Sequence, residues 1–324
     1  MDKLSIIRQP VEKELAKYKD LFDAALAHED DFLGQALAYV RSRKGKMMRP
    51  LLVILIAREL GKISEDTLRS AVTLELLHTA SLVHDDVVDE SGERRGQRSV
   101  NAVYDNKVAV LVGDYLLSTS LLQATKTHNI KVVEIISRLG GTLSEGEVFQ
   151  LANIRNESIT EEAYFQIIHH KTAALFAACA ELGAISAGAN AVYVERAKKF
   201  GELVGLCFQI RDDIFDYYED AEIGKPTGND MLEGKLTLPA IYVVNQSDNS
   251  DIRCLAQLVK SGKATQSDIL RLVEYTKQYG GVEYAEKKMQ QLHDEAIELL
   301  KSWNNNAVRQ ALEKYIDFVV ERNI

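Results

Sequence analysis

Residues 76–89 read LLHTASLVHDDVVD, an apolar run that ends in a cluster of aspartates. A second segment, residues 208–217, reads FQIRDDIFDY and carries the same cluster. Each cluster has the form DDxxD and is called a pentad below: Asp85 to Asp89 is the first and Asp212 to Asp216 the second. Because an unpaired charge is costly to remove from water, two carboxylate clusters inside apolar segments indicate bound cations.

The spacing within each pentad suits one cation on one helical face. With about 1.5 Å rise per residue and about 3.6 residues per turn, the first and fifth carboxylates lie about 6 Å apart along the axis. Magnesium prefers a few carboxylates together with water and substrate phosphates. The middle residues, Asp86 and Asp213, point elsewhere and are interpreted as supporting or capping groups. The candidate metal ligands are Asp85, Asp86, Asp89, Asp212, Asp213 and Asp216.

A single DDxxD on a helix is more often a solvated acidic patch or a helix-start cluster than a metal site. Two copies, each directly after apolar residues, weaken that alternative. The pair therefore favours metal-bound phosphate.

Helical periodicity dominates the chain, and strand-like alternation is hard to find. Because no linker rich in proline, glycine or serine marks a boundary, we expect residues 1–324 to form one large all-α domain. Helices are predicted over residues 10–28, 30–42, 48–60, 64–90, 99–105, 108–125, 130–153, 160–187, 190–220, 231–246, 251–260, 266–278, 280–302 and 306–321.

The composition excludes several classes of protein. A net charge of -9 argues against nucleic-acid binding, which selects basic surfaces. The 3 cysteines have no paired spacing, so neither a disulfide framework nor a zinc site is expected. No signal peptide and no membrane-spanning stretch are expected either, and the predicted location is the cytoplasm.

Basic residues accompany the first pentad. Lys46 and Arg49 lie near a predicted helix N-terminus, a place suited to anions, although solvated charges there would be ordinary. Arg94 and Arg95 follow the pentad closely; they could be salt-bridged to it or bind phosphate through their forked donors. His78 lies two turns before Asp85 and is either a core histidine or a phosphate contact.

Further polar groups follow downstream. Lys171 and Thr172 begin an otherwise apolar run. After the second pentad come residues 224–230, GKPTGND, and residues 233–239, EGKLTLP. These loops could be plain connectors, but beside an acidic cluster they are interpreted as a mobile lid over phosphate.

In this ordered set, the chain resembles the trans-isoprenyl diphosphate synthases, also called polyprenyl synthetases. The resemblance spans residues 44–240 and rests on the motifs GKxxRP, LLHTASLVHDDVVD, RRG, KT, FQIRDDIFDY, GKPTGND and EGKLTLP. It departs where the family's usual Gly-Gly-Lys-Arg loop reads Lys44-Gly45-Lys46-Met47, so that one basic group is lost and another gained.

The resemblance implies an all-helical homodimer with the isoprenoid synthase fold, whose two pentads face each other across a deep central cavity. It implies about two or three Mg²⁺ ions per site, with Mn²⁺ as a possible substitute. Asp85, Asp89 and Asp212 would be the principal ligands, supported by Asp86 and Asp216. Contacts to the allylic diphosphate would come from Arg94, Lys171, Lys225 and Lys235. The isopentenyl diphosphate site would comprise Lys46, Arg49, His78 and Arg95. The catalytic groups would be Lys171 together with Thr172 and Gln209, which match polar groups that face the carbocation.

The implied reaction joins isopentenyl diphosphate to an allylic primer, with farnesyl diphosphate as the expected primer, by ionisation, condensation and elimination. Ala80 and Ser81 lie one turn before Asp85 and are small, so a bulky floor that would stop chain growth early is missing. Leu77 lies deeper on the same helix. By analogy with the family we expect an octaprenyl-like product of about C30 to C50, a quinone side chain that could reach a membrane.

Four alternatives remain open at this point. A short-chain farnesyl or geranylgeranyl diphosphate synthase would differ only in product length. A non-catalytic subunit of a heteromeric synthase would typically lose an aspartate cluster or its arginines. A terpene cyclase would carry an Asn/Ser/Glu metal motif in place of the second pentad. A scaffold with solvated acidic patches would bind no diphosphate in the presence of magnesium.

Overall fold

A computed structural model describes residues 3–29, 31–42, 45–94, 96–154, 159–218, 227–304 and 306–322. Within these ranges nearly all regular structure is helical, so the predicted all-α class is confirmed. The first half holds α1 Lys3–Arg8, the 3-10 helix η1 Gln9–Val11, α2 Glu12–Ala25, α3 Asp31–Ser42, α4 Met48–Leu60, α5 Glu65–Val88, α6 Val100–Val103, α7 Asn106–Thr125 and α8 Ile130–Ile154. The second half holds α9 Glu161–Ile168, the π-helix η2 His169–Ala173, α10 Ala174–Ser186, α11 Ala191–Phe215, α12 Asn229–Leu232, α13 Leu238–Gln246, α14 Ser250–Lys260, α15 Gln266–Gln278, α16 Gly281–Lys301 and α17 Ala307–Glu321.

The chain divides into two compact units, each drawn from three stretches of sequence. Unit 1 comprises Met1–Gly140, Leu175–Gly201 and Trp303–Lys314. Unit 2 comprises Gly141–Ala174, Glu202–Ser302 and Tyr315–Ile324. The first pentad belongs to unit 1 and the second to unit 2, and the single domain expected from the sequence stays a prediction.

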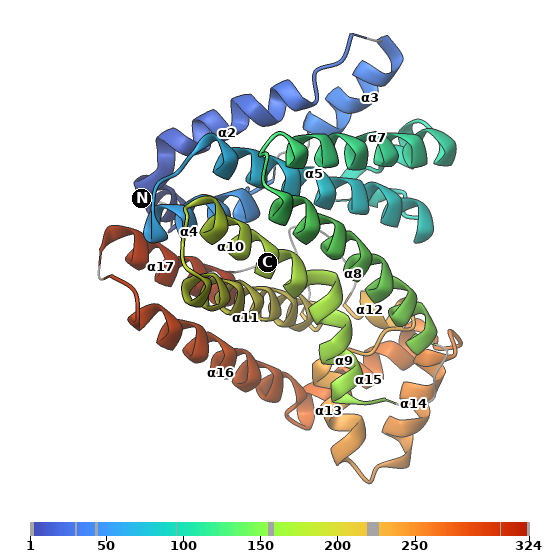
Figure 1. Ribbon diagram of the computed structural model, residues 1–324. Helices are drawn as coiled ribbons and strands as arrows, with labels where there is room; N and C mark the ends of the chain where they lie inside the picture. Colours follow the sequence, from blue (N-terminus) through green and yellow to red (C-terminus); the bar gives the residue numbers. More distant parts are fainter. Residues whose placement is uncertain are drawn as a thin grey trace. The chain divides into compact units, whose positions relative to one another are not determined.

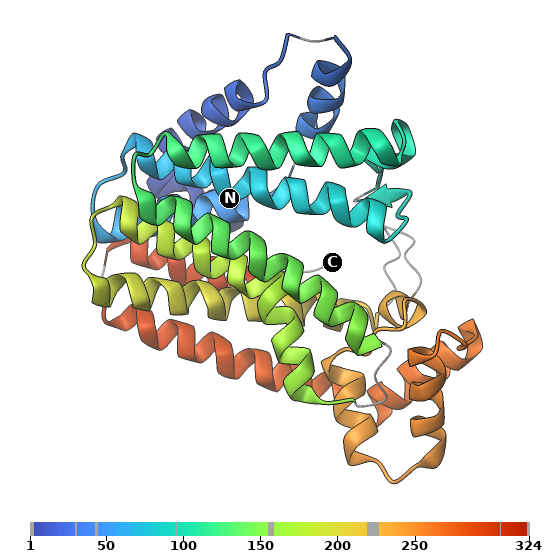
Figure 2. The same ribbon diagram turned by 45° about the vertical axis from the view of Figure 1, so that its right-hand side comes forward.

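Unit 1 is built around α4, α5 and α7. Every residue of α4 from Leu51 to Ala57 is fully buried, as expected for a core helix that is apolar all round. α5 begins at a capping box: the Ser64 side chain accepts from the backbone N–H of Thr67, whose own side chain accepts from the N–H of Ser64. α5 and α7 run side by side in both views (Figures 1 and 2), which brings α7 against the helix that carries the first pentad.

α7 is also the one described helix that is long and apolar enough to cross a membrane by length and composition alone. Core helices of soluble proteins pass the same test, so this is weak evidence. Only 39% of the apolar window is buried, so much of the apolar surface of α7 is exposed.

Unit 2 places α13 against α16, and the rings of Tyr242 and Tyr284 stack between them with centroids 4.0 Å apart. α13 begins after Thr237 with Pro239 in its first turn, where a missing N–H does no harm. Lys235 lies in the short stretch directly before α13. Because α13 packs against α16, this stretch is connected to the packed helices of unit 2.

Several predicted boundaries are wrong. The helix expected over residues 160–187 is interrupted by the π-helix η2, and the one over 231–246 is divided into α12 and α13. Pro239 explains the division, because a proline inside a helix removes a hydrogen bond and clashes with the preceding turn. The helix over 190–220 ends at Phe215, and α1 lies outside the predictions. A short antiparallel ribbon, β1 Glu93–Arg94 and β2 Gln97–Arg98, follows the first pentad.

A histidine in unit 2 gives the fold a dependence on pH. His293 Nε2 lies 2.9 Å from Asp317 Oδ1. Burial opposes the charged imidazole, but hydrogen bonds to Asp317 and Asp294 outweigh it, so the pKa is raised above 6.5. The stabilisation is complete below about pH 6.5 and is lost as pH rises through the raised pKa. Asp317→Asn should therefore lower the melting temperature more at about pH 6 than at about pH 9.

Thermal melts across this pH range test the expectation. Glu298→Gln is the matched control, because Glu298 pairs with Lys301 at the exposed surface and the pair contains no histidine. An Asp317→Asn deficit that is equal at both ends of the range would contradict the linkage.

Candidate active site

The first pentad closes α5. Asp85 lies in the last turn and Asp89 is the C-cap residue, so the pentad is helical as predicted. Asp86 is fully buried, whereas Asp85 is half-buried and Asp89 is exposed. Arg94 Nε donates to Asp86 Oδ1 at 2.5 Å. The middle carboxylate thus faces away from its neighbours and ties the β1–β2 ribbon to the helix.

A close helix contact supports this pentad. A Cβ added at Gly113 on α7 would lie 2.3 Å from Nε2 of His84, so any larger residue there would have to displace the His84 ring. His84 Nε2 lies 3.1 Å from the carbonyl oxygen of Val110 and 3.4 Å from Asp114 Oδ1. Since His84 directly precedes Asp85, α7 fixes the backbone that presents the first carboxylate.

The basic residues predicted for the isopentenyl site lie in unit 1. The guanidinium carbon of Arg49 is 5.0 Å from the centroid of the Phe176 ring, and its buried Nε has no hydrogen-bond acceptor among the described residues. Lys46 is exposed, and its carbonyl accepts a hydrogen bond from Arg8. His78 is buried on α5. Arg95 lies outside the described residues.

The residues expected to limit chain length lie on α5. Ala80 and Leu77 are 2% and 4% exposed, respectively. Ser81 is half-buried and donates to the carbonyl of His78 at 2.9 Å. Their role as a floor stays a prediction.

The second pentad closes α11 and meets a residue that sequence reasoning missed. Arg322, which follows α17, donates to Asp212 Oδ1 and also to the carbonyl of Phe208 at 3.0 Å. Its guanidinium carbon lies 3.9 Å from the centroid of the Phe208 ring. The Arg211 guanidinium donates two hydrogen bonds to the backbone carbonyl of Arg322, at 3.1 and 3.2 Å. Arg322 is so distant in sequence that no local pattern could have indicated the contact.

Asp216, the last residue of this pentad, holds a loop. Its Oδ1 accepts from the backbone N–H of Asn229 at 2.9 Å and its Oδ2 from that of Asp230 at 3.1 Å. The carboxylate therefore anchors the end of the GKPTGND segment at the start of α12. Lys225, predicted to contact phosphate from this segment, lies outside the described residues.

The π-helix η2 presents Lys171 and Thr172. A Cβ at Gly146 on α8 would lie 2.5 Å from the Cβ of His170, so the two segments pack at the distance that only glycine allows. Lys171 Nζ lies 2.7 Å from Glu147 Oε2 and donates to Gln150 Oε1 at 3.1 Å. Glu147 and Gln150 were not predicted, because helical residues with ordinary polar side chains carry no signal of their own.

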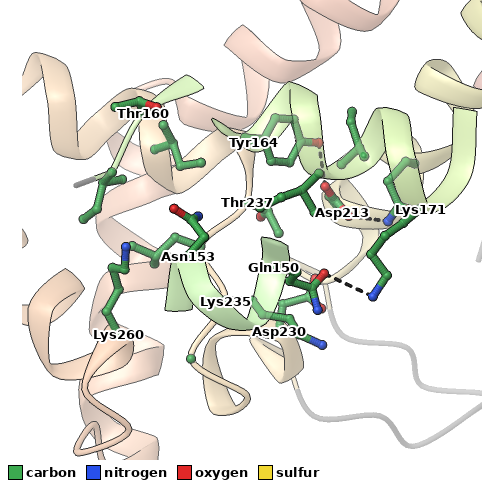
Figure 3. A pocket seen from close by; sticks show the side chains of 17 residues that line it. Gln150, Asn153, Thr160, Tyr164, Lys171, Asp213, Asp230, Lys235, Thr237 and Lys260 are labelled. Atoms are coloured by element: carbon green, nitrogen blue, oxygen red, sulfur yellow. Dashed lines mark hydrogen bonds between the residues drawn. The ribbon is translucent and has the colours of Figure 1, made fainter. Parts of the chain in front are cut away.

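A cavity of about 220 Å³ in unit 2 joins several of these residues (Figure 3). Its lining includes Lys171, Gln209, Asp213 and Lys235 from the sequence predictions. Asp230, Tyr164 and Lys260 are additional polar members. The apolar part of the lining, called the apolar wall below, consists of Ile159, Ile167, Ile168, Leu236 and Ile241.

The electrostatics of the cavity depend on burial. Desolvation and the nearby Asp216 raise the pKa of Asp230 to about 7, while Lys235 opposes the rise. Burial likewise raises the pKa of Asp213 well above its ordinary value, against hydrogen bonds from Tyr164 and Gln209. Desolvation lowers the pKa of Lys260. Extra positive charge delivered near the carboxylates would therefore be favourable.

Over the part of the chain that the structure describes, carboxylates do not form a complete metal-binding cluster. Among the described residues, no three His, Cys, Asp or Glu side chains are grouped closely enough to hold a metal ion by themselves. Such a cage is not required for magnesium, which takes few protein ligands and relies on water and phosphate. Whether the two pentads meet stays a prediction.

In unit 2, Asp213 of the second pentad and two lysines line a cavity together with apolar side chains, a set of groups that suits a prenyl-transferring enzyme. The chain belongs to the polyprenyl synthetase family, whose profile matches residues 30–276. It is 34% identical to the octaprenyl diphosphate synthase of Escherichia coli over 286 residues, 88% of each protein.

Solved structures agree. The geranylgeranyl pyrophosphate synthase of Bacteroides thetaiotaomicron is 48% identical with a TM-score of 0.88, covering 99% of this chain and 100% of that one. The polyprenyl synthase of Caulobacter crescentus, complexed with calcium and isoprenyl diphosphate, is 31% identical with a TM-score of 0.92 over 98% of both chains. The protein is thus a polyprenyl diphosphate synthase, as the motifs predicted.

Proposed function

We propose that this synthase adds isopentenyl diphosphate repeatedly to an allylic diphosphate, with farnesyl diphosphate as primer, to give an all-trans product longer than twenty carbons. The observation that carries the proposal is the unit 2 cavity, where Lys171 and Lys235 adjoin an apolar wall. Cations beside an apolar surface suit a ligand with a diphosphate head and a hydrocarbon tail.

Lys171 and Lys235 are both held in position by neighbouring side chains, and we propose that they bind the diphosphate group. Lys171 contacts Glu147 and Gln150, and Lys235 Nζ lies 2.5 Å from Glu233 Oε2. These acidic neighbours hold each ammonium group in place without a ligand. A diphosphate supplies more negative charge than one carboxylate, so both lysines can exchange partners when it binds. Arg94, now paired with Asp86, is proposed to join them.

Mg²⁺ suits the pentads on the evidence of their present partners. Asp212 already accepts a hydrogen bond from a cation, the Arg322 guanidinium, which supports its assignment as a group that binds positive charge. Asp85 and Asp89 are also reachable, whereas Asp86 and Asp213 are buried. We propose Asp85, Asp89 and Asp212 as the main ligands. Bound Mg²⁺ would neutralise the charge that develops on departing diphosphate.

The isopentenyl site is proposed at Lys46, Arg49, His78 and Arg95. Its support is Arg49, whose buried Nε lacks an acceptor among the described residues. A buried donor without a partner is costly, and a phosphate oxygen would satisfy it.

The proposed reaction is the one that the family resemblance implies, with the placed residues in named roles. The bond between the allylic C1 and the diphosphate oxygen breaks, and the electron pair leaves with diphosphate, held by Lys171 and Lys235. The double bond of isopentenyl diphosphate then forms a bond to C1. Loss of a proton, with released diphosphate as the base, restores a double bond in a product five carbons longer. The apolar wall excludes water, which would otherwise convert the cation to an alcohol.

Product length has two candidate answers. Ala80 and Ser81 leave the predicted floor small, and an octaprenyl diphosphate synthase is among the relatives, which favours a long product of about C30 to C50 for quinone side chains. The 48% identity to a geranylgeranyl pyrophosphate synthase favours a twenty-carbon product instead. The mass of the final product distinguishes them.

Ala80→Tyr is expected to shorten the product, because a phenol ring would fill space below the first pentad. Chromatography of the dephosphorylated products measures the change. Thr79→Tyr on the neighbouring face is the matched control and should leave product length as it is. Unchanged length in Ala80→Tyr would refute the floor assignment.

A homodimer is proposed through the exposed face of α7. Val110, Leu111, Leu121 and Leu122 are 39%, 67%, 39% and 53% exposed, and they recur at helical spacing. Such a stripe on a soluble chain marks an interaction surface, and self-association is the commonest solution.

Leu111→Glu is expected to shift the protein from dimer toward monomer, because a carboxylate would have to be desolvated in the interface. Sedimentation velocity measures the shift. Glu134→Gln, on the exposed face of α8, offers a surface control. A monomeric parent protein would exclude the proposal outright.

The central test is an elongation assay. Purified protein is incubated with Mg²⁺, isopentenyl diphosphate and farnesyl diphosphate, and product mass is followed over time. Asp85→Ala serves as the control. Elongated product from the parent protein and none from the variant is the expected result. No product from either would reject catalysis and favour the non-catalytic subunit, whereas a product that stops at twenty carbons would reject only the long-chain proposal.

A further inference from the structure

Four polar side chains in unit 2 form one continuous chain of hydrogen bonds. Thr172 Oγ1 donates to Gln209 Oε1 at 2.7 Å, and Gln209 Nε2 donates to Asp213 Oδ1 at 2.8 Å. The Tyr164 hydroxyl lies 2.6 Å from Asp213 Oδ2, the contact drawn in Figure 3. This hydrogen-bond network connects the π-helix η2 through α11 to α9.

The donors and acceptors in this network have a defined order. A carboxylate oxygen accepts hydrogen bonds, so Asp213 requires the nitrogen of the Gln209 amide to face it. The amide oxygen then faces Thr172, whose single proton is used in that bond. The remaining N–H of Gln209 stays on the nitrogen end of the amide, beside Asp213. At the other end, the Gln209 oxygen and the Thr172 hydroxyl have only lone pairs left to offer.

The orientation of the Gln209 amide is not determined by the glutamine side chain itself. An amide turned by half a rotation has nearly the same shape but would present its NH₂ group where the oxygen now lies. Only the acceptor at Asp213 distinguishes the two orientations. Tyr164 holds that acceptor from its other side, and Tyr164 and Asp213 are only 5% and 4% exposed.

We propose that Tyr164 and Asp213 are positioning residues that keep Gln209 and Thr172 turned with their lone pairs toward the reacting carbon. The inference rests on the proposed function and extends it to a residue that no motif indicated. A positive charge that develops at the allylic C1 is stabilised by fixed oxygen dipoles and opposed by N–H groups. The network would therefore favour the cation over the neutral substrate.

The inference also gives Asp213 a role other than metal binding. Both of its oxygens already accept hydrogen bonds inside the protein. Its neighbours in the pentad differ: Asp212 reaches a guanidinium and Asp216 the backbone of α12. Each aspartate of the second pentad thus has a separate task.

Tyr164→Phe tests the proposal because it removes one hydroxyl and keeps the ring. Two ligands are compared by calorimetry in the presence of Mg²⁺. One is a farnesyl thiolodiphosphate, which is uncharged at its first carbon and does not react. The other is an ammonium analogue with nitrogen in place of that carbon, bound together with inorganic diphosphate.

The variant should bind the ammonium analogue about tenfold more weakly, the size expected for a weakened hydrogen-bond network to a charge. Affinity for the thiolodiphosphate should stay within about twofold of the parent. In the assay, kcat should fall while KM for farnesyl diphosphate holds. Equal loss for both ligands, or loss for neither, would overturn the proposal.

Tyr217→Phe is the matched control. Tyr217 is another buried tyrosine of unit 2, and its hydroxyl lies 3.2 Å from Thr237 Oγ1 without contacting Gln209. It should lose thermal stability as Tyr164→Phe does and leave both affinities unchanged. A control that weakens the ammonium analogue equally would show a general effect of lost packing and overturn the assignment. A parent protein that binds neither ligand would instead reject the proposed function.

Discussion

Asp212→Ala is expected to lower the rate of chain elongation by at least about a hundredfold at a fixed Mg²⁺ concentration. The variant loses a carboxylate that no neighbour replaces, because Asp213 is buried and Asp216 is bound to α12. Since the Asp212 side chain is 41% exposed, the fold should tolerate the change. Product formation against Mg²⁺ concentration measures the effect.

Asp248→Ala is the control for this loss, since Asp248 is a fully exposed acid of the same unit. Arg322→Gln should act in the opposite direction. It removes the guanidinium that now occupies Asp212, so half-maximal activity should require less Mg²⁺. An Asp212→Ala variant with more than half of the parental rate would remove Asp212 from the site.

Gly183→Ala is expected to destabilise the protein by about 1–3 kcal/mol, the usual effect of overpacking a core. A Cβ at Gly183 would lie 2.6 Å from the carbonyl oxygen of Val53 and 3.1 Å from Cβ of Ile56. Because the first atom belongs to the backbone of α4, no side-chain rotation relieves the contact, and α4 and α10 must separate. The melting temperature should fall by several degrees.

Gly140→Ala provides a control of opposite sign. Gly140 lies within α8, and nothing approaches the position of its added Cβ within 4 Å. Alanine there should stabilise the helix by about 0.5–1 kcal/mol, because it restricts the unfolded chain. If both variants shifted the melting temperature in the same direction, the close approach of α4 and α10 would be in doubt.

The sequence predicted most of what local chemistry determines. Helix positions followed from periodicity, and α5 ended within the first pentad where its apolar run ended. The different orientation of Asp86 followed from helical geometry alone. These features depend on residues a few positions apart, which a single sequence displays directly.

Contacts between distant segments escaped prediction. Arg322 reaches Asp212, Glu147 reaches Lys171, and Tyr164 reaches Asp213 only after the chain has folded. Each partner is of a common type in an ordinary helical setting, so nothing in its neighbourhood marks it. The π-helix η2 was missed for a related reason, because it differs from an α-helix in hydrogen bonding and not in composition.

The π-helix η2 at His169–Ala173 also determines the direction in which the side chains of α9 point relative to those that follow it. Each residue of an α-helix rotates the side-chain direction by about 100°, so a turn that holds one residue more than usual offsets everything before it. Tyr164 precedes the offset and Thr172 lies within it, yet both reach the same strip of α11. Removing His170 would allow uninterrupted α-helical winding but would swing Tyr164 roughly a quarter turn from Asp213. Any homologue one residue shorter here must therefore find a different partner for that carboxylate.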